Sequence, residues 1–213
     1  MSLLLVLLRH GRSEADDLRI HEGRHDSALT ERGRQQAEER LADFRQQGLS
    51  FDRVISSPLA RAKATAEVIS RGLGVPLVID PDWTEMDKGR LAGLSFDEAA
   101  RRFPKPTSRD LYRRYHEGES VAELHARALR AVARIASGGE GRVLVVSHGA
   151  ILNAAMRCLL GIAPMPGEAG AHFSFGDLGC AVLTYHPQKH AWRLRRFEAG
   201  FDAHDSEAVE KRA

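Results

Sequence analysis

Two histidines each follow an apolar run of strand length and precede a glycine. His10 comes two positions after residues 3–8, and His148 comes two positions after residues 142–146. The carboxyl ends of strands form the ligand crevice of open α/β sheets, so we expect the two imidazoles to face one another there. A neutral imidazole nitrogen can act as a nucleophile or bind a metal ion.

A third group of residues lies in segment 56–66, which reads Ser-Ser-Pro-Leu-Ala-Arg-Ala-Lys-Ala-Thr-Ala. Ser57 and Pro58 predict the start of a helix after a short strand, with Arg61 in its first turn. The free amides of a helix N-terminus favour an anion, and an arginine adds a permanent cation with a forked donor face. Taken alone, Arg61 fits a solvated helix position equally well. With the two histidines, it indicates a site for an anion.

The elements that must position these residues alternate between strand and helix. Strands are expected at residues 3–8, 53–56, 75–79 and 142–146, and the region 172–197 is strand-rich. Helices are expected after Thr30, from Ser57 to residue 73, after Ser120 and over 150–160, with capping boxes at Ser95–Glu98 and Ser120–Glu123. This order predicts a single three-layer α/β/α domain with a mostly parallel central sheet over residues 1–200, followed by a polar tail at 201–213.

Composition restricts the class of protein. The 213 residues are 43% apolar and 28% charged, with a formal net charge of +2. These values are typical of a globular protein and argue against a general nucleic-acid or membrane-surface binder. The longest apolar run, residues 3–8, is too short for a membrane span. Cys158 and Cys180 form no disulfide or zinc pattern, so we expect buried thiols and a cytoplasmic protein, and a dimer is possible.

Together these residues resemble the histidine phosphatase superfamily, in its phosphoglycerate-mutase-like branch. The matching motifs appear in the family's order and span about residues 3–197: Arg9-His10-Gly11, the segment 23–33, Ser57-Pro58-Leu59-Ala60-Arg61-Ala62 with Thr65-Ala66, Glu85 with Gly89 and Gly93, Gly118-Glu119-Ser120, and Ser147-His148-Gly149. The resemblance implies a phosphoglycerate-mutase-like fold, a small phosphorylated metabolite as partner, and no cofactor or metal.

The resemblance also implies a role for each site residue. His10 would be the nucleophile that forms a phosphohistidine, and Glu85 would be the proton donor. The phosphate pocket would consist of Arg9, Arg61 and His148. Two guanidiniums and a protonated imidazole can stabilise the equatorial oxygens of a transferring phosphoryl group without a metal. Substrate contacts are further implied for Ser13, Asp16, Glu22, Gly23 and Gly149.

The identity of the acid rests on the family pattern alone. In Trp-Thr-Glu-Met-Asp-Lys, residues 83–88, either Glu85 or Asp87 could be a plain solvated loop acid. The family places its acid four residues before one glycine and eight before another, and that spacing to Gly89 and Gly93 selects Glu85.

Several departures from the mutases favour a phosphomonoesterase. Asp16 replaces an asparagine, Met86-Asp87-Lys88 replaces the usual Arg and Tyr contacts, and Leu91-Ala92 replaces an aromatic-acid pair. The segment 94–119 is also shorter than the corresponding lid of the mutases. The alternative within the family is a cofactor-dependent phosphoglycerate mutase. From another class, the chain could be a metal-binding protein, with ligands His10, His21, His25 and His148, or a regulatory phospho-ligand binder.

Overall fold

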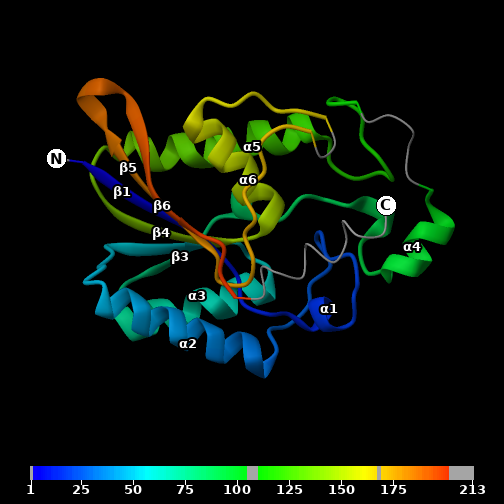
Figure 1. Cartoon of the computed structure of the whole chain (residues 1–213), viewed down its shortest axis with the longest axis horizontal. Helices are drawn as coiled ribbons and strands as arrows, with labels where there is room; N and C mark the ends of the chain where they lie inside the picture. Colours follow the sequence, from blue (N-terminus) through cyan, green and yellow to red (C-terminus); the bar gives the residue numbers. More distant parts are fainter. Residues whose placement is uncertain (1, 105–109, 167–168, 202–213) are drawn as a thin grey trace.

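A six-stranded sheet with the order β3-β2-β4-β1-β5-β6 separates two layers of helices (Figure 1). The computed structural model describes residues 2–104, 110–166 and 169–201. The strands are β1 (Leu3–Arg9), β2 (Arg53–Ser56), β3 (Leu77–Ile79), β4 (Gly141–Ser147), β5 (Cys180–His186) and β6 (Ala191–Glu198). The strands β1 to β4 run parallel to one another, β5 pairs antiparallel with β1, and β6 pairs antiparallel with β5 at the edge of the sheet. The expected α/β/α architecture with a mostly parallel sheet is confirmed.

Two apolar cores flank the sheet, and β1 supplies side chains to both. Leu3, Leu5 and Leu7 pack against α5 (Val121–Ser137) and α6 (Gly149–Leu160), whereas Val6 and Leu8 face α2 (Glu31–Gln46) and α3 (Ala60–Leu73). Successive side chains of a strand point to opposite faces, so a strand covered on both sides must be apolar throughout. This explains why residues 3–8 form an uninterrupted apolar run.

Short elements join the layers near the carboxyl ends of the parallel strands. They are α1 (Glu14–Asp17), α4 (Phe96–Arg102) and the 3₁₀ turns η1 (Pro81–Trp83) and η2 (Gly89–Leu91), while η3 (Pro187–Lys189) lies in the β5–β6 hairpin. The capping box expected at Ser120 is present, and at Ser95 the hydroxyl accepts the N–H of Glu98. Across the residues that the structure describes, no helix is long and apolar enough to cross a membrane.

Two expected boundaries are wrong. Helix α3 begins at Ala60 rather than at Ser57, because the Ser57 hydroxyl is engaged in the turn, where it accepts the N–H of Leu59. Strand β3 begins only after Pro76, which has no N–H to add to the ladder. The region expected to be strand-rich, 172–197, does contain the two strands β5 and β6, which begin at Cys180 and Ala191.

The expected polar tail at 201–213 is described only at its first residue. The N–H of Phe201 bonds to the carbonyl of Asp177, so this residue is held against the body of the molecule. Residues 202–213 lie outside the described residues, as do 105–109 of the expected lid segment.

Candidate active site

The two motif histidines meet where β1 and β4 end side by side. The N–H of His10 bonds to the carbonyl of Ser147, which continues the register of the two strands. Both imidazoles are buried, and their ring centroids lie 5.0 Å apart with the edge of one toward the face of the other. The expected juxtaposition across the crevice is therefore present.

The hydrogen bonds of His10 define which ring nitrogen is free to react. Nδ1 lies 2.7 Å from the carbonyl oxygen of Gly11, and because a carbonyl can only accept, the ring proton sits on Nδ1. Nε2 therefore carries the lone pair, and Nε of Arg61 donates to it at 3.2 Å. Burial, together with the cations Arg9 and Arg61 and against the opposing effect of Glu22, lowers the pKa of His10 to about 4. The imidazole is neutral at pH 7.

Arg61 is fully buried in the first turn of α3. Its Nη1 donates to the carbonyl of His25 at 3.0 Å, and its Nη2 donates to the carbonyl of Gly23 at 2.9 Å. These carbonyls belong to the loop after α1, which therefore wraps around the guanidinium. The carbonyl contacts hold the guanidinium beside His10, where its forked donor face can meet an anion.

Arg9 approaches the same point from the end of β1. Its Nη1 donates to the carbonyl of Phe175 at 3.1 Å, and its Nη2 donates to Asp16 at 3.3 Å. Asp177 lies 3.7 Å from Nη1. Asp16 also accepts the N–H and the hydroxyl of Ser13 in the capping box of α1. Although burial opposes it, these contacts hold the pKa of Asp16 below its usual value, so the carboxyl is ionised.

Glu22 places a second carboxylate against the nucleophile. Its Oε1 accepts the hydroxyls of Ser13 at 2.6 Å and Ser27 at 3.0 Å, and lies 3.3 Å from Nε of Arg61. Its Oε2 lies 3.8 Å from Nε2 of His10. Burial would raise the pKa of Glu22, but His10 and Arg61 lower it below its ordinary value. This carboxylate is therefore a fixed negative charge at the site.

His148 completes the inner site, and its two ring nitrogens differ in their hydrogen bonding among the described residues. Nε2 lies 2.8 Å from the hydroxyl of Ser57. Nδ1 is buried and has no hydrogen-bond partner among the residues that the structure describes. Burial, followed by His10 and the two arginines, keeps the pKa of His148 well below its usual range. An unpaired buried nitrogen beside the nucleophile is available to an oxygen of a bound anion.

Glu85 lies at the N-terminus of α6, next to His148. Its carboxylate accepts the N–H groups of Ala150 at 3.1 Å and Ile151 at 3.2 Å, just beyond Gly149. Asp87 instead accepts the N–H of Gly89 and pairs with Arg24 at 3.4 Å. The structure therefore places Glu85, and not Asp87, at the helix terminus that directly follows His148.

Sequence reasoning missed Arg127, which holds the Glu85 loop from behind. This buried arginine of α5 makes a two-pronged pair with Glu119 at 3.0 and 2.7 Å. It also donates to the carbonyls of Asp82 at 2.9 Å and Glu85 at 3.3 Å. A charged residue at the border of the apolar face of α5 is the signal that could have indicated it.

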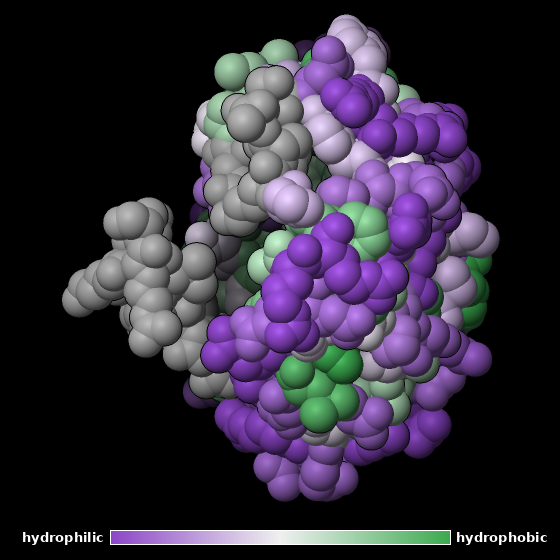
Figure 2. Space-filling model, turned by 90° about the vertical axis from the view of Figure 1, so that its right-hand side faces the viewer, coloured by the Kyte–Doolittle hydropathy of each residue, from purple (hydrophilic) through white to green (hydrophobic). Residues whose placement is uncertain are grey.

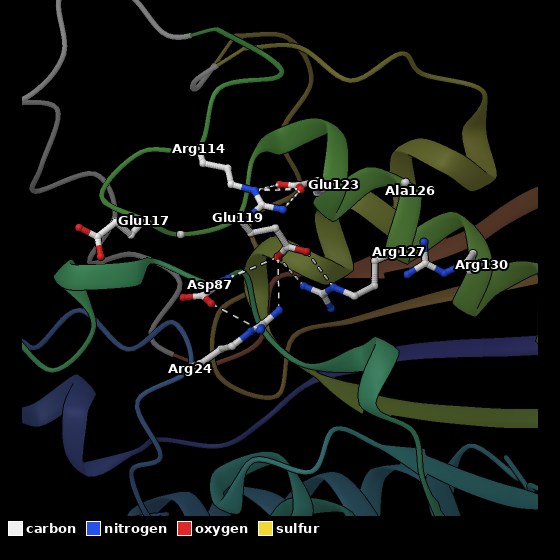
Figure 3. A pocket seen from close by; sticks show the side chains of 10 residues that line it. Arg24, Asp87, Arg114, Glu117, Glu119, Glu123, Ala126, Arg127 and Arg130 are labelled. Carbon is white, nitrogen blue, oxygen red and sulfur yellow. Dashed lines mark hydrogen bonds and ion pairs between the residues drawn. The ribbon is translucent and has the colours of Figure 1, made fainter.

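A charged pocket of about 350 Å³ adjoins the Glu85 loop (Figure 3). Its lining comes from the loop after α1, the Glu85 loop, the segment before α5 and α5 itself, and most of it is arginine or carboxylate: Arg24, Asp87, Arg114, Glu117, Gly118, Glu119, Glu123, Ala126, Arg127 and Arg130. The outer surface that carries α1 and α4, toward which β1 points, is also largely hydrophilic (Figure 2). The surroundings of the site are therefore polar rather than apolar.

The alternative of a metal site is not supported by the arrangement of donors. Within residues 2–104, 110–166 and 169–201, no three His, Cys, Asp or Glu side chains are placed to hold a metal ion. His21 instead packs against the ring of Phe96 with centroids 4.7 Å apart. The four histidines considered as ligands do not form a donor cluster.

A family model described as "Histidine phosphatase superfamily (branch 1)" matches residues 5–199. The chain belongs to the histidine phosphatase superfamily. Among its curated relatives, a "probable phosphoglycerate mutase" of Erwinia tasmaniensis is 34% identical over 89% of this chain and 87% of the relative. An "uncharacterized phosphatase" of Bacillus subtilis is 32% identical over 70% of this chain and 74% of the relative.

Other members differ in length or are known by structure. A "bifunctional protein" of Mycobacterium tuberculosis is 39% identical over 68% of this chain, but the match spans only 40% of that relative. A solved structure from Bacillus stearothermophilus has a TM-score of 0.79 at 26% identity, covering 94% of this chain and 98% of that one. The superfamily thus includes relatives with both phosphatase and mutase names.

Proposed function

We propose that this histidine phosphatase superfamily member is a metal-independent phosphomonoesterase of small phosphorylated metabolites, acting through a phosphohistidine on His10. The observation that carries the proposal is the state of His10. Its proton is held on Nδ1 by the carbonyl of Gly11, its ring is neutral, and Nε2 points its lone pair at the guanidinium of Arg61. A neutral imidazole whose free lone pair lies beside a cation can attack phosphorus as soon as an anionic phosphoryl group takes that position.

The proposed reaction has two displacements at phosphorus. In the first, Nε2 of His10 forms the N–P bond while the bond from phosphorus to the alcohol oxygen breaks. Glu85 takes up a proton when the phosphate dianion binds beside it and gives that proton to the leaving oxygen. In the second, water attacks the phosphohistidine, Glu85 takes a proton from the water, and the N–P bond breaks to release phosphate. Splitting the hydrolysis in this way replaces one difficult step by two easier ones.

The cationic groups have separate tasks in this proposal. Arg9 and Arg61 stabilise the charge on the equatorial phosphoryl oxygens, and both are fixed by carbonyl contacts before substrate arrives. Nδ1 of His148 has no hydrogen-bond partner among the described residues. In this proposal it donates a hydrogen bond to another phosphoryl oxygen. A dianion beside His148 favours its protonated form, which offsets the burial that keeps it neutral in the free protein.

The phosphatase is favoured over the mutase by charge near the nucleophile. A mutase must hold a phosphorylated carboxylic acid and keep water from the phosphoenzyme. Here Asp16 and Glu22 add two carboxylates to that space. We place the enzyme in the cytoplasm, which fits its two free cysteines, Cys158 and Cys180.

The test is a comparison of wild type with His10→Ala in buffer containing EDTA. Wild type should release phosphate from p-nitrophenyl phosphate and, after rapid quenching with a ³²P-labelled substrate, carry an acid-labile, base-stable label. His10→Ala should lose both by several orders of magnitude while its circular dichroism spectrum is unchanged. Label that persists in His10→Ala, or activity that EDTA abolishes, would refute the proposal.

A further inference from the structure

Two ionised carboxylates flank the nucleophile on the side of α1. Glu22 lies 3.8 Å from Nε2 of His10, and Asp16 lies 3.3 Å from the guanidinium of Arg9. Both are mostly buried, with side-chain exposures of 15% and 21%. Their charges are therefore screened less by solvent than those of surface acids. A third acid, Asp177, lies 3.7 Å from Arg9. The acids therefore balance the charge of the two arginines, and the inner site offers little for an anion besides the reacting phosphoryl group.

The charged pocket beside the Glu85 loop likewise offers little unpaired positive charge to a second anion. Its arginines are each paired within the protein: Arg127 with Glu119, Arg114 with Glu123, and Arg24 with both Asp87 and Glu119, as the dashed lines of Figure 3 show. Arg130 likewise lies 3.5 Å from Asp82. A second phosphate or carboxylate on a substrate would have to displace one of these carboxylates to gain a cation. The pocket therefore presents alternating donors and acceptors with little net positive charge.

The pocket shares two chain segments with the reacting groups. Arg24 directly follows Gly23, whose carbonyl accepts Arg61, and Asp87 follows Glu85 by two residues. In an in-line displacement the alcohol leaves on the side of phosphorus opposite Nε2, toward the acid that protonates it. The alcohol portion of the substrate consequently extends past Glu85 toward this pocket.

We infer that the enzyme selects phosphomonoesters of neutral or cationic polar alcohols and discriminates against phosphorylated carboxylic acids and bisphosphates, with Glu22 and Asp16 as the specificity-determining residues. This inference rests on the proposed phosphatase function. A positive group on the alcohol is attracted by the two carboxylates, a hydroxyl group can bond to the paired side chains of the pocket, and a negative group is repelled. At an effective dielectric constant of about 20 and separations of about 8 Å, each carboxylate changes the affinity for the substrate by about tenfold or more for every unit of charge on the alcohol group.

The test uses three phosphomonoesters with one two-carbon skeleton and different terminal charge: phosphoethanolamine, 2-hydroxyethyl phosphate and phosphoglycolate. Each is measured as a competitor of p-nitrophenyl phosphate hydrolysis, so a constant is obtained whether or not the compound is turned over. In wild type, phosphoethanolamine and 2-hydroxyethyl phosphate should compete at least about tenfold better than phosphoglycolate. In Glu22→Gln and in Asp16→Asn, the ratio between phosphoethanolamine and phosphoglycolate, which differ by two unit charges, should shrink by about a hundredfold or more.

Glu14→Gln is the matched control, because Glu14 is an exposed acid of the same short helix α1 as Asp16. It should leave the ratio at the wild-type value. Equal constants for the three compounds, a preference for phosphoglycolate, no competition by phosphoethanolamine, or an unchanged ratio in both site variants would overturn the inference. These outcomes are distinct from a failure of the proposed function, which would be seen as no His10-dependent release of phosphate from p-nitrophenyl phosphate itself.

Discussion

Replacing Arg127 by methionine should destabilise the protein and disable Glu85 at the same time. The side chains of Arg127 and Glu119 are only 9% and 10% exposed, and the substitution leaves the Glu119 carboxylate buried without its main partner. Loss of one member of a buried pair costs about 3–5 kcal/mol. Arg24, at 3.9 Å from Glu119, compensates in part, so we expect a loss at the lower end, about 3 kcal/mol. For a domain of this size, that corresponds to a fall in Tm of about 10 °C.

The catalytic effect follows from the carbonyls that Arg127 holds. Without its bonds to Asp82 and Glu85, the loop that aims the Glu85 carboxylate loses its anchor. A displacement of about 1 Å can cost about a hundredfold in rate, so kcat on alkyl phosphates should fall by about that factor. The loss on p-nitrophenyl phosphate should be much smaller, because nitrophenolate leaves without a proton.

Thermal unfolding and kinetics on both substrates measure the two effects. Arg130→Met is the matched control: Arg130 lies on the same helix but is 59% exposed, so its variant should resemble wild type. A double variant, Arg127→Met with Glu119→Gln, should be less destabilised than the sum of the single variants by about 2 kcal/mol. A Tm for Arg127→Met equal to that of Arg130→Met, or equal rate losses on the two substrates, would show that the reasoning is wrong.

Three further outcomes are expected. Glu85→Gln should reduce kcat on alkyl phosphates far more than on p-nitrophenyl phosphate, and equal losses would assign Glu85 a structural task instead. His10 has a pKa of about 4 in the folded protein and about 6.5 when unfolded, so the unfolded state binds more protons between these values and stability should rise with pH across that interval; urea titrations of His10→Gln should show a shallower rise, and identical slopes would contradict the assignment. With 3-phosphoglycerate and a trace of 2,3-bisphosphoglycerate, formation of 2-phosphoglycerate should not outrun phosphate release, whereas isomerisation far in excess of it would identify a mutase.

Local patterns predicted the fold where burial on both faces of the sheet dictates residue type. The apolar run before His10 and the matching run before His148 allow little except buried parallel strands, and the structure confirms them as β1 and β4. The start of α3 was misplaced, because Ser57 and Pro58 are typical of a helix start but Ser57 instead supports His148. His148 lies 91 residues further along the chain, so this contact cannot be predicted from the residues around Ser57.

The same distinction applies to the site. His10, Arg61 and His148 were found because each lies at a recognisable junction between a strand and a helix. Arg127 and Asp177 were not, because their importance comes only from tertiary contacts to the Glu85 loop and to Arg9. A sequence pattern can therefore indicate the reacting residues. The residues that orient them or neutralise their charge are brought to them by tertiary packing and are not visible in the local pattern.

The backbone around His10 has a consequence for the order in which the protein acquires activity. The carbonyl of His10 accepts the N–H of Leu178, the N–H of Arg9 bonds to Gly179, and the side chain of Arg9 bonds to Phe175, 166 residues further along. A ribosome would therefore have to release most of the domain before the nucleophile could be seated between its neighbouring strands. Contacts of such long sequence separation form late and slowly. A nascent or truncated chain that ends before residue 175 would contain His10, Arg61, Glu85 and His148 and still be inactive.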